Sequence, residues 1–199
     1  MMNKYNLIQQ RRLMNEYKEM MRINGDIIQI EPMGVVPYKK YRVSYNIRTI
    51  ISPLPEYRDT TVCILTIPKN YPNDAPHLVV DDESMPPPWH VNWYKKGMWD
   101  FGCWSPTDSL VIFLLRCARS LQFDPYITCT TCTSNFEALS FWNANASNRD
   151  IIPSDTQVLP KLHIPEITTN NSRIVPRIVI KPQQNFVNST LCEELIDKY

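Results

Sequence analysis

The chain contains little glycine, almost no net charge and no long apolar run. Only 4 of its 199 residues are glycine, and 21 basic side chains nearly balance 20 acidic ones. A net charge of +1 excludes a strong field that would attract nucleic acid or anionic lipid from a distance. No apolar run approaches the ~18 residues of a membrane-spanning helix, and the first residues lack the apolar segment of a secretory signal. We therefore expect a cytoplasmic protein that binds neither nucleic acid nor membrane.

The six cysteines do not by themselves predict disulfides. An even count implies a disulfide framework only in a short secreted chain, which this sequence does not resemble. Cys63 and Cys117 lie inside apolar runs, so we expect them to be buried thiols in a reducing compartment.

Cys129 and Cys132 have the spacing of zinc ligands. A structural zinc ion needs four ligands, and His163 and Cys192 are the only plausible further donors. A redox Cys-x-x-Cys motif usually follows a thioredoxin-like strand, whereas a helix end is expected before this one. We expect two ordinary thiols here, with no metal and no cofactor.

The order of periodic segments predicts an α+β fold. Residues 7–23 carry apolar side chains at helical spacing and end at Asn24-Gly25. Extended segments rich in Ile, Val, Thr and Tyr follow, at residues 26–31, 41–51, 60–67 and 77–80. After a long loop, an apolar helix is expected over 107–121, opened by Ser105-Pro106, and another over 134–142. The sequence thus predicts an N-terminal helix, an antiparallel four-stranded sheet, a reactive loop and C-terminal helices.

The chain is expected to have two parts. Residues 1–150 form one domain. From residue 151 to residue 199, Asn, Ser, Thr and Pro alternate with short β-like pieces such as residues 173–180. We expect an extended, partly mobile tail that covers its own domain or adds a strand to a sheet edge.

The stretch PPPWHVNWYKKGMWDFGCWSP, residues 86–106, is the most informative. It holds four of the five tryptophans, two of the four glycines, a His-x-Asn triplet and a cysteine beside a tryptophan. It lies between a strand-like block and a helix-like block. Nucleophilic and turn-forming residues at such a junction suggest a reactive loop on a rigid scaffold.

Five short motifs follow one another from the end of the predicted sheet to the end of the 107–121 helix. They are Tyr71-Pro72 with Ala75-Pro76, His90-Val91-Asn92, Gly97, Trp104-Ser105-Pro106, and Ser120-Leu121 through Asp124-Pro125. In this order they resemble the motifs of ubiquitin-conjugating enzymes: Tyr-Pro-x-x-Pro-Pro, His-Pro-Asn, a glycine before the active-site segment, Trp-Ser-Pro and Ser-Leu-x-x-Asp-Pro. Ala75 and Val91 replace family prolines. The resemblance covers about residues 8–142 and implies the ubiquitin-conjugating (UBC) fold.

This resemblance also implies an activity and partners. Such a transferase accepts a ubiquitin-like protein, or a protein C-terminus, from an activating enzyme as a cysteine thioester and passes it to an amine of an acceptor protein. The small size, divergent motifs and composition are more similar to prokaryotic relatives, whose genes often accompany those of activating enzymes in antiviral defence. The resemblance implies no small-molecule cofactor, because another protein consumes the ATP.

The resemblance places a carboxylate where the family has its catalytic cysteine. Counted from the His-x-Asn triplet or from Gly97, the aligned residue is Asp100, and Cys103 follows in the same loop. We expect Cys103 to be the nucleophile, Asn92 to stabilise the oxyanion or order the loop, and His90 to hold the loop by hydrogen bonds. Asp100 would orient or deprotonate the incoming lysine, although an ionised carboxylate close to the thiol would raise the thiol pKa.

Two other functions stay open. The chain could be an inactive variant of the same fold that binds its partner non-covalently, with Asp100 in place of the thiol. It could also be an unrelated α+β interaction domain.

Overall fold

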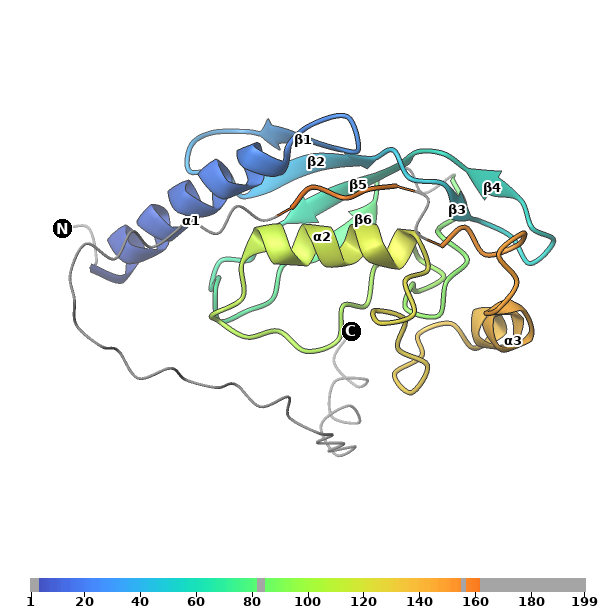
Figure 1. The fold of residues 1–199 in the computed structure, drawn as a ribbon. Coiled ribbons are helices and arrows are strands. Elements are labelled where there is room, and N and C mark those ends of the chain that lie inside the picture. The colour runs from blue at the N-terminus through green and yellow to red at the C-terminus, as the bar shows by residue number, and fades with distance from the viewer. Residues whose placement is uncertain (1–3, 82–84, 155–156, 162–199) are drawn as a thin grey trace, which may run out of the picture. The chain divides into compact units, whose positions relative to one another are not determined.

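The computed structural model describes residues 4–81, 85–154 and 157–161, which belong to one compact unit ending at Leu162. His163, Cys192 and the segment 173–180 lie outside the described residues, so the expectations about them remain predictions. The elements follow in the order α1 (Lys4–Ile23), β1 (Ile28–Met33), β2 (Lys40–Tyr45), β3 (Thr49–Ile50), β4 (Tyr57–Arg58), β5 (Thr61–Thr66), β6 (His77–Val80), α2 (Leu110–Leu121) and α3 (Phe136–Asn145) (Figure 1).

The predicted α+β architecture is confirmed in its main parts. Four strands form one antiparallel sheet in the order β1-β2-β5-β6, and β3 pairs with β4 in a small second sheet. In β2 and β5 every second side chain is buried, which is the alternation expected of strands with one face on the core. Helices α1 and α2 contribute to the same core cluster as these strands, and that cluster contains the buried Cys63 and Cys117.

Helix α1 fixes the start of α2 through one buried carboxylate. The Tyr71 hydroxyl donates to Glu16 Oε1 at 2.8 Å, and the Leu110 amide donates to Glu16 Oε2 at 2.9 Å. The guanidinium of Arg12 binds Glu16 at 3.3 Å and the Asp108 carbonyl oxygen at 2.6 Å. Because Glu16 is only 6% exposed, these bonds are well protected from water. The end of the 86–106 loop is therefore held against α1.

Both C-terminal helices begin later than the sequence predicts. Helix α2 starts at Leu110 because the Ser109 side chain accepts the Ile112 amide, whereas Ser105 and Asp108 close a separate turn before it. Helix α3 starts at Phe136, with the Asn135 side chain accepting the amide at its N-terminus. In both cases a polar residue further along the chain, Ser109 or Asn135, provides the N-cap.

A second, smaller core lies beside the first. It contains the buried residues Ile50, Val91, Phe123, Ala138, Trp142 and Ile152. The first described residues of the predicted tail contribute to it: Ile152 is fully buried, and the Tyr57 hydroxyl donates to the Ile151 carbonyl oxygen at 2.9 Å. Within the described residues, no helix combines the length and apolar character needed to cross a bilayer.

Candidate functional site

The centre of the 86–106 loop is a small hairpin. Trp93 pairs with Trp99 across it, and the Asp100 amide donates to the Asn92 carbonyl oxygen at 2.8 Å. The turn is closed at Gly97, whose φ of +83° lies in the left-handed region that favours glycine. Asn92 and Asp100 therefore lie opposite each other on the two arms of the hairpin, although eight positions separate them in the sequence.

This hairpin is bonded to the outer edge of β6. The Val80 amide donates to the Gly97 carbonyl oxygen at 2.9 Å, and the Trp99 amide donates to the Leu78 carbonyl oxygen at 3.0 Å. A β-carbon placed on Gly97 would lie 3.2 Å from the β-carbon of Val80. The sheet thus positions the hairpin directly, and Gly97 permits the close approach.

His90 is a buried structural residue. Its Nδ1 accepts a hydrogen bond from the backbone amide of Asn92 at 3.1 Å. Nε2 therefore carries the proton and donates to the Thr128 hydroxyl at 3.3 Å. The Thr128 hydroxyl in turn donates to the Asp124 carbonyl oxygen at 2.8 Å, and the imidazole packs against Phe123 with ring centroids 4.8 Å apart. Burial lowers the pKa of His90 to about 3, so the ring is neutral at physiological pH. These contacts are those expected of a loop-holding residue.

The Asn92 side chain binds the turn at residues 129–132. Its Nδ2 donates to the carbonyl oxygens of Cys129 and Cys132, both at 3.0 Å. Its Oδ1 accepts the Cys129 amide at 2.9 Å. Both amide hydrogens and the amide oxygen are therefore used within the protein. Of the two roles expected for Asn92, these bonds support loop ordering.

Asp100 joins the hairpin to the segment before α3. One carboxylate oxygen accepts the Gly102 amide at 3.0 Å, and the other accepts the Ser134 hydroxyl. Ser134 therefore binds Asp100, and Asn135 is the residue that caps α3. At residue 100 the structure therefore has a half-buried carboxylate with both oxygens bonded.

Cys103 is exposed on a segment that is anchored on both sides of it. Before it, the Phe101 carbonyl oxygen accepts the guanidinium of Arg116 at 2.8 Å. After it, the Trp104 indole donates to the Pro72 carbonyl oxygen at 2.8 Å. The rings of Phe101 and Trp104 pack edge-to-face, with centroids 6.4 Å apart. The aromatic side chains therefore support the backbone, and the thiol faces solvent.

The structure brings three of the four predicted site residues together and places the fourth further along the loop. His90, Asn92 and Asp100 are joined through the hairpin and its bonds, whereas Cys103 follows after Gly102, which has a φ of +75°. The structure also brings the Cys129–Cys132 turn to Asn92, which the sequence analysis did not expect. The Cys-x-x-Cys spacing was the available signal, but nothing in the sequence showed where that turn lies.

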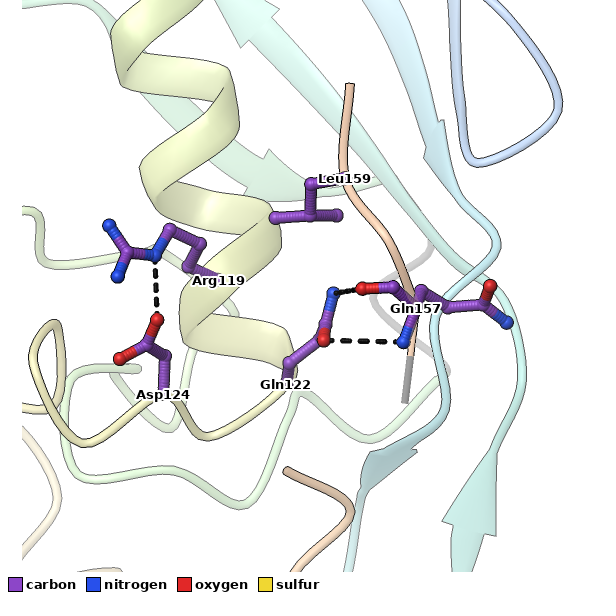
Figure 2. A pocket seen from close by; sticks show the side chains of 5 residues that line it. All are labelled: Arg119, Gln122, Asp124, Gln157 and Leu159. Atoms are coloured by element: carbon purple, nitrogen blue, oxygen red, sulfur yellow. Dashed lines mark hydrogen bonds and ion pairs between the residues drawn. The ribbon is translucent and has the colours of Figure 1, made fainter. Parts of the chain in front are cut away.

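A depression lies at the C-terminal end of α2 (Figure 2). It has a volume of about 290 Å³ and is lined by Arg119, Gln122, Asp124, Gln157 and Leu159. Its polar groups bind one another: Arg119 pairs with Asp124 at 2.6 Å, and Gln122 donates to the Gln157 carbonyl oxygen at 3.1 Å. With its polar groups paired and no nucleophile in its lining, it does not support a catalytic site.

Within the described part of the chain, no group of three or more His, Cys, Asp and Glu side chains lies where it could hold a metal ion. No protein-family model and no curated protein matches this chain. The functional argument therefore depends on the geometry of the hairpin and of the thiols near it.

Proposed function

We propose that the protein is a ubiquitin-conjugating-like transferase that carries a ubiquitin-like protein, or another protein C-terminus, on Cys103. The observation that carries the proposal is the exposure of this thiol on a segment anchored by Phe101 and Trp104. A carrier thiol must be reachable by a polypeptide tail and still be held in place. The partners are then the carried protein, its activating enzyme and an acceptor protein.

In this function the thiolate of Cys103 attacks the carbonyl carbon of the thioester on the activating enzyme and displaces that enzyme's thiolate. An acceptor amine later attacks the new thioester, loses a proton and releases the Cys103 thiolate. Asp100, earlier in the same loop, would orient that amine or accept its proton. Neutral His90 and the Asn92 amide hold the loop and the 129–132 turn, and they do not transfer protons.

The test is the formation of an adduct on the purified protein. Wild type is mixed with ATP, an activating enzyme and the ubiquitin-like protein that this enzyme charges, then analysed on a non-reducing gel. We expect an adduct that dithiothreitol removes, and a Cys103→Lys variant whose adduct resists dithiothreitol. Cys132→Ser, which changes another exposed cysteine, should keep the wild-type adduct. A dithiothreitol-sensitive adduct that persists in Cys103→Ala would remove Cys103 from this role.

A second function, non-covalent binding of the same partner, is favoured by one specific observation. Asp100 pairs with Asn92 at the position that aligns with the family cysteine, and the amide of Asn92 has no bond left for an oxyanion. In that case the hairpin would bind the partner without a thioester. Tight binding of the ubiquitin-like protein, measured by calorimetry and unchanged in Cys103→Ala, with no adduct on wild type, would favour this function.

A further inference from the structure

Several hydrogen bonds in the Cys129–Cys132 turn are directed at the sulfur atom of Cys129. The Cys132 amide donates to Cys129 Sγ at 3.3 Å, and the Thr131 hydroxyl oxygen lies 3.3 Å from the same sulfur. The Cys132 thiol also bonds to it. These bonds stabilise negative charge on sulfur. They outweigh the effect of partial burial, so the pKa of Cys129 is lowered.

The two thiols of this turn are close together and reachable. Cys132 is exposed, Cys129 is partly exposed, and neither forms a disulfide. Two other cysteines provide an internal comparison: Cys63 and Cys117 are fully buried, and burial raises the pKa of both thiols. Among the cysteines that the structure describes, reactivity toward a reagent in solution is thus expected only at the exposed turn and at Cys103.

The backbone of the turn is fixed by the hairpin of the candidate site. The Asn92 side chain donates to the carbonyl oxygens of both cysteines and accepts a bond from the Cys129 backbone amide. The Ser134 backbone amide donates to the Val91 carbonyl oxygen at 2.8 Å. A turn held by four such bonds keeps its two sulfur atoms near each other without a further loss of chain entropy.

We propose that Cys129 and Cys132 form a thiol–disulfide exchange site that reacts with small disulfides and closes to an intramolecular disulfide. This inference does not rest on the proposed transferase function, since it concerns different sulfur atoms and needs no protein partner. Its substrate class is a low-molecular-weight disulfide, with oxidised glutathione as the probe.

The reaction has two balanced steps. The Cys129 thiolate attacks one sulfur of the small disulfide; the S–S bond breaks, and one small thiolate leaves and takes up a proton. The Cys132 thiol then loses its proton and attacks the Cys129 sulfur of the mixed disulfide, which displaces the second small thiol. Two protein thiols are oxidised, and one disulfide is reduced to two thiols.

The test uses the full chain in glutathione buffers of increasing oxidised fraction, without any ubiquitin-like protein or activating enzyme. Aliquots are quenched by alkylation and mapped by mass spectrometry. We expect the peptide carrying Cys129 and Cys132 to lose two hydrogens and both alkylation sites, at a lower oxidised fraction than that at which Cys103 gains glutathione. Separate glutathione adducts on Cys129 and Cys132, or two reduced thiols while Cys103 is modified, would overturn the inference.

Matched variants identify the attacking sulfur. Cys132→Ser should accumulate a stable glutathione adduct on Cys129, because the resolving thiol is missing. Cys129→Ser should gain glutathione on Cys132 more slowly, because the turn directs its donors at residue 129. Equal or reversed rates would overturn the assignment of Cys129 as the attacking thiol. Since the adduct assay on Cys103 uses different reagents, failure of the transferase function would leave this result unchanged.

Discussion

The buried imidazole of His90 should make the free energy of unfolding depend on pH. Burial lowers its pKa to about 3, whereas an unfolded histidine titrates near pH ~6.5. Between these values the unfolded state binds one more proton than the native state, so the free energy of unfolding falls as the pH is lowered. The loss begins below about pH 6.5 and amounts to about 1.4 kcal/mol per pH unit until about pH 3.

We predict that His90→Asn removes this slope, although its stability at pH 7 will be lower. The asparagine keeps an acceptor for the Asn92 amide but does not titrate. Urea unfolding at several pH values between 4 and 7 measures the effect, and the exposed His77, changed to Gln, is the control. A His90→Asn protein with the wild-type slope would show that His90 is protonated in the native state.

At this scale the sequence predicted residue environments better than residue partners. Cys63 and Cys117 are buried as their apolar neighbours indicated, and His90 has the structural contacts expected of it. The partners of the Asn92 side chain, and the Ser134 partner of Asp100, lie more than 30 residues further along the chain, in a segment without a strong periodic pattern. Such contacts depend on how elements pack, which local patterns do not encode.

At the scale of elements, the fit between the hairpin and β6 depends on one glycine. Gly97→Ala would place a methyl group 3.2 Å from the Val80 β-carbon, at a φ of +83°. We predict a loss of about 2–3 kcal/mol in the free energy of unfolding, of which about 1–2 kcal/mol is left-handed strain and the rest is the contact. Urea denaturation measures the total.

Gly102→Ala is the matched control for this prediction. Its φ is +75°, and an added β-carbon would meet nothing within 4 Å, so it should lose only the strain component. The difference between the two variants measures the contact with β6. Equal losses would mean that the hairpin does not press against that strand.

Element types were predictable from periodicity, but element ends were not. The helices and the four long strands occur in the predicted order, because their apolar spacing matches a period of 3.6 or 2. The expected strand at residues 41–51 is divided into β2 and β3, where the Asn46 amide donates to the Ile27 carbonyl oxygen. Element ends depend on which polar residue caps a helix, as Ser109 and Asn135 do, and on which strands pair, and the periodic pattern fixes neither.

At the scale of the whole domain, the described residues contain two cores of unequal size. Helix α3 belongs to the smaller one through Trp142, whose ring stacks on Phe123 with centroids 6.2 Å apart and planes 14° from parallel. We predict that Trp142→Ala loses about 3–5 kcal/mol in the free energy of unfolding. Amide hydrogen exchange should quicken most in α3 and the 129–135 segment, and least in β5.

Phe136→Ala provides the comparison for this variant. Phe136 begins the same helix but is 74% exposed, so its removal should change stability by no more than about 0.5 kcal/mol. Faster exchange spread evenly over both cores of the Trp142→Ala protein would contradict the division into two cores.

The bonds between the hairpin and β6 have a consequence for the edge of the sheet. An edge strand has unpaired backbone amides and carbonyl oxygens, and these can pair with a strand of another chain. Here the backbone of Gly97 and Trp99 pairs with the outer edge of β6. The stretch that leads to Cys103 therefore also shields the β6 edge of the sheet from pairing with another chain.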